Sequence, residues 1–412
     1  MRKHMVKVII ISVISALLVL IMPEIQPVVH ANGYPPVTVY KDSEFEGTSQ
    51  SFDTGMYDVS YLTAPGGVGN DTISSIRVAP GYKVTLYKDA GFSGSTKVLT
   101  ADDNWLSDFN DVTSSIKVET VNPVDATCIQ VDEFDDVSKA QILRTFAPRI
   151  WMAVGETYWA SSVEWALPYL QRYFNTSYNK YSYTTLQPLS SPTHKLPFFA
   201  GDQESAVCYS FWTEKTYNNV DLSYWQFSPY NYGKVVLGQE FGNHVGDWEH
   251  VTVRLAKFTY EGKNYVKPVL VCYSSHDFVN VYTWDEVTKV DSTHIVAYCA
   301  KGSHGMWKDP GSHVYKNIII AKLKDECSAG TAWDTWNCLE TFEFFPATGT
   351  GRAVGTSTWP SYFDKDYTNP NSLCAYRWGN EQLGEIFGQP ILAAGPSGPE
   401  QKEALNNDTL LR

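Results

Sequence analysis

The sequence has no block of lysine and arginine, and beyond residue 22 it has no long apolar run. Proteins that bind nucleic acids neutralise phosphates with clustered basic residues, so a nucleic-acid partner is not expected. A helix that crosses a bilayer needs about 20 apolar residues, and no segment approaches that length. These two absences exclude nucleic-acid-binding proteins and multi-span membrane proteins.

The one apolar run, Val8 to Met22, follows three basic residues and precedes Val-His-Ala at positions 29–31. Fifteen apolar residues are short for a membrane anchor but typical of an export signal, so we expect residues 1–31 to be a signal peptide. The mature protein is then secreted. Cleavage after Ala31 removes three basic residues and one acidic residue and changes the net charge from −13 to −15, which favours cations as ligands.

Cysteine is absent from the first 127 residues, and all seven cysteines lie in the rest of the chain. Export permits disulfides, and an odd number leaves at least one thiol without a partner. We therefore expect up to three disulfides in the C-terminal region. Cys327 and Cys338 enclose a short segment and are the expected pair. No Cys-x-x-Cys motif indicates a zinc ribbon.

A repeat fills the N-terminal region. YKDSEFEG at 40–47 recurs as YKDAGFSG at 87–94, and NDTISS at 70–75 is matched by NDVTSS at 110–115. The segments between them are short, rich in β-branched residues and bounded by glycine and aspartate, which is typical of strands joined by tight turns. Two copies of one β motif are therefore expected.

Both repeated elements resemble the βγ-crystallin family, a pair of Greek-key motifs, over residues 34 to 119. The resemblance implies a calcium-binding domain over residues 32–120. The implied oxygen ligands are Asp71, Ser74, Asp111 and Ser114. Calcium takes six to eight hard oxygen ligands, which such loops supply. The alternative is a domain of the same fold whose loops no longer bind calcium.

The composition changes after a short proline-containing linker at 121–127, because tryptophan becomes frequent. Within residues 137–152, the spacing of apolar residues predicts a helix that ends before Pro148. A second helix is expected over 161–174, where Pro168 should introduce a kink. Strands dominate from about residue 209. We expect a mainly β protein: a Greek-key domain, then a β-sandwich-like domain with a few helices at 128–395. A frayed polar tail should follow at 396–412.

The segment FGNHVGDWEHVTVRL, residues 241–255, alternates like a strand. Asp247 and Glu249 begin a face that is otherwise aliphatic, and unpaired buried carboxylates are very costly. With His244 upstream beside glycines, they could hold Mg²⁺, Ca²⁺, Mn²⁺ or Zn²⁺. The other interpretation is that they accept hydrogen bonds from loop amides or pair with an arginine such as Arg149.

Several phrases, among them FAPRIWM, SSVEWALP, NHVGDWEHVTV and THIVAYCAKGSHGMW, resemble the vacuolar protein sorting-associated protein 62 family over residues 130 to 390. NHVGDWEHVTV is also similar to the GHRHDWEHVVV segment of the necrosis- and ethylene-inducing peptide-like cytolysins. That resemblance implies a metal held by His244, Asp247, Glu249 and, upstream, Asn231. Gly246 stands where those proteins have a second histidine.

His276 and His304 follow strand-like segments beside small residues, and each could line the same cleft or make a structural hydrogen bond. His250 lies on the opposite strand face from Asp247 and is not expected to be a ligand. No G-x-S-x-G, H-E-x-x-H or glycine-rich phosphate loop occurs, so enzymatic activity is not the favoured prediction.

The favoured function is a secreted calcium-binding protein whose C-terminal domain uses a second metal to recognise a cell-surface glycan or glycolipid on a membrane. By the resemblance to cytolysins, this would be a toxin or a host-interaction factor. Two alternatives remain: a secreted metal-dependent hydrolase, and a non-toxic structural protein of a cell wall or spore coat.

Overall fold

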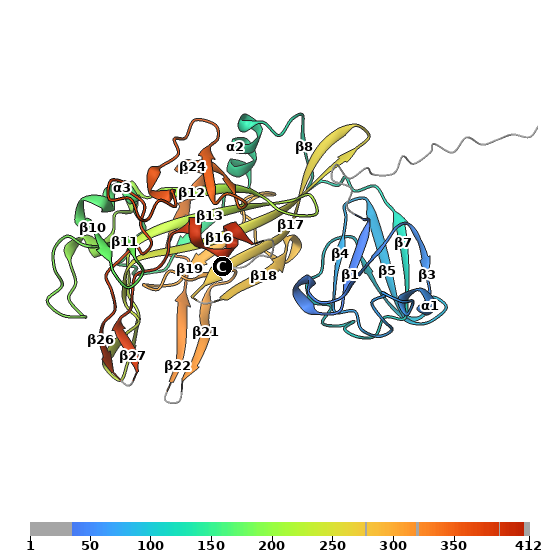
Figure 1. Cartoon of the computed structure of the whole chain (residues 1–412), viewed down its shortest axis with the longest axis horizontal. Helices are drawn as coiled ribbons and strands as arrows, with labels where there is room; N and C mark the ends of the chain where they lie inside the picture. The colour runs from blue at the N-terminus through green and yellow to red at the C-terminus, as the bar shows by residue number, and fades with distance from the viewer. Residues whose placement is uncertain (1–34, 277, 319–320, 387, 408–412) are drawn as a thin grey trace, which may run out of the picture.

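The computed structural model describes residues 35–276, 278–318, 321–386 and 388–407. Two bodies lie side by side in it, a small N-terminal domain and a larger C-terminal domain (Figure 1). Both consist mainly of strands, so the predicted fold class is confirmed. The predicted signal peptide, residues 1–31, lies outside the described residues. No helix in the described part of the chain is long and apolar enough to cross a bilayer.

The N-terminal domain consists of two sheets. The first has the order β2-β1-β4 and the second β3-β7-β5-β6. Strand β3 comes from the first sequence repeat but pairs with β7 of the second, while Asp103 of the second repeat bridges to Ile76 in β4 of the first. The two motifs therefore exchange strands. The strands are β1 Val37–Tyr40, β2 Ser49–Phe52, β3 Gly55–Tyr57, β4 Ser75–Val78, β5 Tyr82–Asp89, β6 Ser93–Leu99 and β7 Ser115–Thr120.

The C-terminal domain is built on an eight-stranded sheet with the order β18-β17-β16-β13-β12-β24-β25, and β8 pairs with β17. β16, the DWEH strand, spans seventeen residues and is central in the sheet. The members are β8 Ile129–Val131, β12 Cys208–Glu214, β13 Asn219–Asn231, β16 His244–Tyr260, β17 Lys263–Ser275, β18 Phe278–Thr283, β24 Leu339–Phe345 and β25 Thr350–Ala353.

A second sheet, β20-β19-β9-β23, covers one face of the large sheet. Val251 and Val253 of β16 share a buried apolar core with Ile150 of β9 and Ala297 of β19. The opposite face carries Trp248 and is covered by loops and short helices. This is a sandwich-like arrangement, and the predicted alternation of β16 is confirmed. The strands are β9 Arg149–Met152, β19 Val296–Cys299, β20 Met306–Trp307 and β23 Thr331–Asp334.

Four two-stranded hairpins complete the domain, and two of them, β21–β22 and β26–β27, project from its body (Figure 1). The hairpins are β10 Leu170–Asn175 with β11 Lys180–Thr185, β14 Lys234–Val236 with β15 Gln239–Phe241, β21 Gly311–Ile318 with β22 Ala321–Cys327, and β26 Leu383–Ile386 with β27 Gln389–Leu392. The α-helices are α1 Val59–Leu62 in the N-terminal domain and α2 Asp136–Thr145, α3 Val163–Ala166 and α4 Glu403–Asn406 in the C-terminal domain.

Three sequence-based expectations were wrong. The predicted helix over 161–174 is limited to α3 and the 3₁₀ turn Leu167–Tyr169, which contains Pro168, and β10 begins directly after it at Leu170. The predicted frayed tail packs against the C-terminal domain through at least residue 407, where Glu400 and Leu405 are fully buried. All seven cysteines are free thiols, so Cys327 and Cys338 form no bridge.

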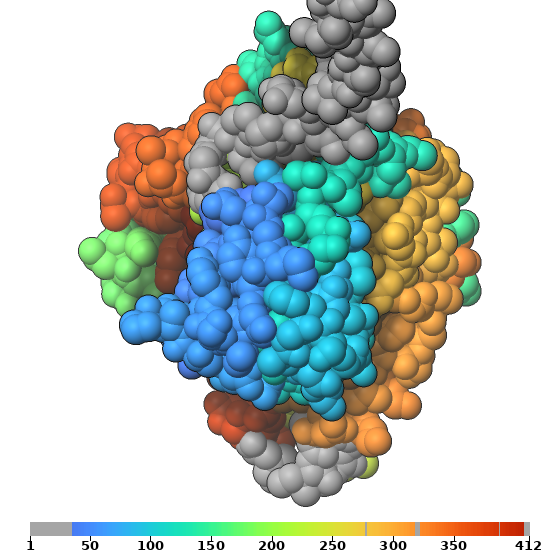
Figure 2. All heavy atoms as spheres, turned by 90° about the vertical axis from the view of Figure 1, so that its right-hand side faces the viewer, coloured from blue at the N-terminus to red at the C-terminus, as the bar shows by residue number. Residues whose placement is uncertain are grey.

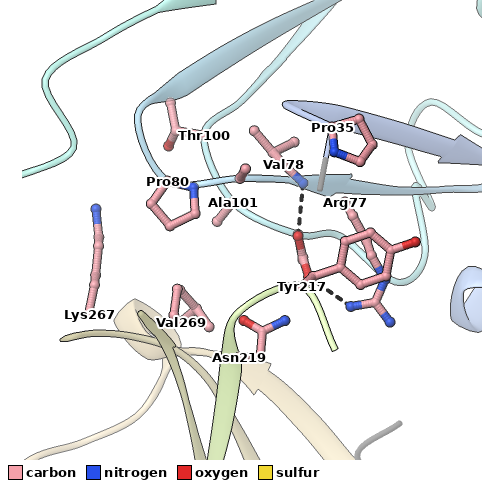
Figure 3. A pocket seen from close by; sticks show the side chains of 13 residues that line it. Pro35, Arg77, Val78, Pro80, Thr100, Ala101, Tyr217, Asn219, Lys267 and Val269 are labelled. Atoms are coloured by element: carbon pink, nitrogen blue, oxygen red, sulfur yellow. Dashed lines mark hydrogen bonds and ion pairs between the residues drawn. The ribbon is translucent and has the colours of Figure 1, made fainter. Parts of the chain in front are cut away.

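The turn between β12 and β13 of the C-terminal domain contacts the N-terminal domain. Tyr217 adopts a positive φ of 57°, a conformation that side chains with a Cβ rarely take, and its hydroxyl lies 2.9 Å from that of Tyr40. The Arg77 guanidinium lies 4.5 Å from the centre of the Tyr217 ring and 4.0 Å from that of Phe45. Figure 3 shows Tyr217 beside Arg77 at a small cavity between the domains. We call Tyr40, Phe45, Arg77 and Tyr217 the clasp.

Candidate functional site

The four predicted calcium ligands come together as two reciprocal pairs. Ser114 Oγ donates a hydrogen bond of 3.1 Å to Asp71 Oδ1, and Ser74 Oγ donates one of 3.4 Å to Asp111 Oδ1. Each pair takes its aspartate from one repeat and its serine from the other. The strand exchange between the motifs therefore builds two similar oxygen sites, which neither repeat could form alone.

The backbone fixes these loops. Asp71 and Asp111 both adopt positive φ, 51° and 53°, and aspartate is one of the few residues that tolerate this region. The Asp71 amide donates to the Thr113 carbonyl and the Asp111 amide to the Ile73 carbonyl, each over 3.1 Å. Both carboxylates are consequently held at the surface, each close to the serine of the other repeat.

The donors and acceptors of these loops fit a cation. Asn70 and Asn110 each turn their amide nitrogen toward the neighbouring aspartate, over 2.7 and 2.9 Å. Within the described structure, the Oδ1 atoms of both asparagines are buried without a hydrogen-bond partner. A buried oxygen without a donor costs roughly 1–3 kcal/mol, and a bound hard cation would remove that cost.

The C-terminal carboxylates have a different environment. Asp247 is 6% exposed, and its Oδ2 atom lies 2.9 Å from Nδ1 of His304, which is fully buried. Nε2 of His304 lies 2.8 Å from the Tyr158 carbonyl. Burial alone would raise the pKa of Asp247, but the His304 hydrogen bond and the nearby His244 hold it below its ordinary value. For His304, burial opposes protonation, but the Asp247 carboxylate raises its pKa. The two side chains form a buried ion pair.

Glu249 is neutralised in another way. Burial first, and then the charge of Asp247, raise its pKa well above the ordinary value, which favours the neutral form of this carboxyl group. Ser274 Oγ lies 2.5 Å from Glu249 Oε2. Gln226 stands directly opposite Glu249 on β13, so its side chain shares the same strand face.

The residues predicted to hold the second metal are only partly brought together. His244 approaches Asp247 only to 4.0 Å, its Nδ1 atom lies 2.6 Å from the Gly246 carbonyl, and burial lowers its pKa. The Asn231 amide donates to the Gly242 carbonyl. Among the described residues no three histidine, cysteine, aspartate or glutamate side chains are placed to hold an ion. Hydrogen bonds with His304 and Ser274 satisfy the two carboxylates that begin this buried strand face.

The alternative prediction, that Asp247 or Glu249 pairs with Arg149, is wrong, because the Arg149 guanidinium pairs with Asp334. His250 lies on the opposite face from Asp247, as predicted, and the centre of its ring lies 4.1 Å from that of the Trp225 ring.

His276 and His304 belong to neighbouring but separate networks. Nε2 of His276 lies 2.9 Å from Oδ2 of Asp325, a fully buried carboxylate in β22 that also accepts hydrogen bonds from Ser303 and Trp307. Lys234 completes the set at 2.9 Å. Asp325 was not among the site residues predicted from the sequence. The same signal that singled out Asp247, an acid at an inward position of an alternating strand, is present in KLKDEC.

These networks are largely buried. His304 and Asp325 are fully buried and Asp247 and Glu249 nearly so, while the side chains of His244 and His276 are 20% and 22% exposed. Hydrogen bonds within the networks connect β16, β17 and β22 to the loop 302–305.

Different known proteins match the two parts of the chain. Residues 190–363 match the family described as vacuolar protein sorting-associated protein 62 (Vps62). The C-terminal domain is a Vps62 family domain. Over 149 residues it is 27% identical to vacuolar protein sorting-associated protein 62 of Saccharomyces cerevisiae, a match covering 32% of this chain and 30% of the yeast protein.

The N-terminal domain is similar to other proteins. It is 36% identical over 85 residues to development-specific protein S of Myxococcus xanthus, covering 21% of this chain and 49% of that protein. It also aligns with a βγ-crystallin domain from Flavobacterium johnsoniae at 40% identity, with a TM-score of 0.20, covering 21% of this chain and 94% of that one. The chain spans at most about half the length of the curated relatives named here.

Proposed function

We propose that this protein is exported and binds two calcium ions in its N-terminal domain, and that it has a structural role outside the cell. The reciprocal pairing of Asp71 with Ser114 and of Asp111 with Ser74 carries the proposal. A pair of similar oxygen sites, each completed by the other repeat, makes a single calcium-linked unit of the two motifs.

The charge balance supports the proposal. Both aspartates are exposed, and neither carboxylate is within 4.0 Å of a basic side chain in the described part of the chain. Two orphaned asparagine oxygens lie beside them. Exported calcium modules usually bind at about 10⁻⁴ to 10⁻³ M, concentrations found outside cells rather than inside. Weak sites on exposed loops would therefore fill after export.

Calorimetric titration of the full chain with calcium tests the proposal. Wild type should bind two ions, and Asp71→Asn should leave one site, because only one of the two pairs loses its charged ligand. Asp53→Asn, an exposed aspartate of the same domain outside both loops, is the matched control and should still bind two. Absence of calcium binding at millimolar concentration would overturn the proposal.

Export itself is tested by the mass of the mature protein. We expect the secreted form to begin after Ala31, because Val-His-Ala ends the apolar signal segment. Retention of residues 1–31 in the protein recovered from the medium would contradict this part.

The structural role is preferred to the toxin and hydrolase alternatives. Both relied on a metal centre at His244, Asp247 and Glu249, and these side chains are engaged with each other, His304 and Ser274 instead. A buried polar network of this kind holds neighbouring strands in one arrangement. We therefore assign the Vps62 domain a rigid supporting role beside the calcium-binding domain.

A further inference from the structure

A groove of about 480 Å³ lies between the two domains, away from the clasp cavity. One wall is the loop of Ser43 and Glu44 with Asn104 and Trp105 of the N-terminal domain. The other wall is the edge strand β18 of the Vps62 domain. Figure 1 shows β18 facing the N-terminal domain, and Figure 2 shows the two domains in contact along this side. Ligand sites often lie at such domain boundaries, with volumes of about 300–1,000 Å³.

We propose that this groove binds a neutral saccharide. Calcium binding and saccharide binding would use different residues, so the groove adds a ligand to the proposed function and does not depend on it.

An exposed aromatic ring is the first observation. Trp105 is 47% exposed at the mouth of the groove, next to Leu106, which is fully buried and fixes the loop in the domain core. Tyr282 of β18 lines the opposite wall. A sugar ring has one face of C–H groups, which packs on an aromatic ring, while its hydroxyls point outward to polar partners. Tryptophan supplies a large, rigid surface for such a contact.

The polar groups are the second observation. Asn104 Nδ2 donates to Glu44 Oε1 over 2.8 Å, and the Glu44 amide donates to the Asn104 carbonyl over 2.9 Å. Glu44 has a positive φ of 58°. These bonds hold a carboxylate and an amide in a fixed orientation beside Trp105. Adjacent hydroxyls of a sugar need such paired donors and acceptors.

The third observation is an unused donor. Asn280, in the middle of β18, has a buried Nδ2 atom with no hydrogen-bond partner in the described structure. A buried donor without an acceptor is unfavourable, and because Asn280 lines the groove, rotation of its amide toward a ligand hydroxyl would satisfy it. Because Asn280 belongs to one domain and Trp105 to the other, the site exists only when the clasp holds the domains together.

Charge decides which ligand class fits. Glu44 is the one side chain among the lining residues of this groove that carries a charge at neutral pH, and the net charge of the chain is −13. A phosphate or an anionic lipid headgroup would be repelled. An extended peptide added to β18 would need apolar pockets for alternate side chains. Ser43, Glu44, Asn104 and Asn280 are polar, so a neutral saccharide is preferred.

Calorimetry of the full chain with chitotetraose, cellotetraose and maltotetraose tests the proposal. At least one should bind, and Trp105→Ala should weaken binding by about tenfold, since an aromatic contact contributes roughly 0.5–1.5 kcal/mol. Trp105→Phe should retain most of the affinity, and Asn280→Ala should weaken it. Tyr61→Ala removes an equally exposed aromatic of the same domain outside the groove and should have no effect.

Three results would overturn the proposal. The first is no binding of any tetrasaccharide at millimolar concentration. The second is binding that Trp105→Ala and Asn280→Ala leave unchanged. The third is binding of an extended peptide in place of the saccharides, which would assign the groove to strand addition at β18.

Discussion

Both domains contain carboxylates that the sequence predicts to be metal ligands, but the surroundings of these carboxylates differ between the two domains. In the N-terminal domain, Asp71 and Asp111 are exposed on loops and lie near orphaned asparagine oxygens. In the Vps62 domain, Asp247 and Glu249 are buried and have His304 and Ser274 as partners. The first arrangement leaves oxygen ligands available for an ion. The second is already satisfied by the chain itself.

This difference shows that a motif of acids and histidines does not by itself define a metal site. NHVGDWEH contains the ligand types that metals prefer, yet its carboxylates are satisfied by residues distant in the sequence. NDTISS contains a single carboxylate, yet its partners leave oxygens free. What decides is whether the folded chain supplies enough donors to the oxygens that it buries.

The largest expected effect is on the Asp247–His304 pair. His304→Ala leaves a buried carboxylate without its partner, which typically costs about 3–5 kcal/mol. Chemical denaturation of the variant should therefore show a large loss of stability, whereas His194→Ala, at a half-buried position in a loop, should change it little. A calcium-dependent rescue of His304→Ala would break the comparison, because it would show that the acidic cluster can hold an ion.

Glu400 gives the next largest effect. Burial raises its pKa from 4.5 to about 7, so the folded state favours the neutral acid. Stability contributed by this group is present below pH 4.5 and is lost as the pH rises to about 7, by about 3 kcal/mol. In Glu400→Gln this part of the pH dependence should disappear, which denaturation curves at pH 5 and pH 8 would show. An unchanged difference between wild type and variant across this range would contradict the prediction.

Calcium should stabilise the N-terminal domain by a smaller amount. At about ten times the dissociation constant, each site adds near 1.4 kcal/mol, so the two sites together add about 2.8 kcal/mol. Wild type should melt at a lower temperature after addition of a chelator, and Asp71→Asn with Asp111→Asn should melt at that lower temperature with or without calcium. Asp247→Asn should keep the full calcium response, which separates the two acidic regions. Loss of the response in Asp247→Asn would mean that they are coupled.

The smallest expected effect is that of a reducing agent. All seven cysteines are free and lie in or beside the C-terminal domain, so reduction should leave its denaturation midpoint unchanged. After unfolding without reductant, seven thiols should react. A count of five or fewer would show that bridges form in the exported protein.

The features that the sequence predicted well depend on local patterns. The approach of Asp71 to Ser114 and of Asp111 to Ser74 could be predicted because all four residues lie in a repeated motif, and β16 could be predicted because its residues alternate. The partner of Asp247 could not be found, because His304 lies 57 residues further along, in a loop of its own. The helical pattern over 161–174 was extended too far, because β10 begins at Leu170, directly after the 3₁₀ turn that contains Pro168.

The burial of residues 396–407 was missed for a related reason. The segment is rich in polar residues, and only its contacts with the rest of the domain show that Ala404 and Leu405 face a core. Lys215 binds the backbone carbonyls of Ala404 and Leu405. The disulfides were predicted from the number of cysteines and the compartment, and neither reports how far apart the sulfur atoms lie.

Strand β16 contacts every major core of the molecule. Near its start Trp248 faces the core covered by loops, in its middle Val251 and Val253 face the core of the second sheet, and at its end Tyr260 packs against the N-terminal domain. From Val251 to Ala256 it has a partner strand on each side, so the amides of this stretch should be among the slowest to exchange with deuterium. Because β16 contacts the cores of both domains, a force applied to one domain would be transmitted along this strand to the other.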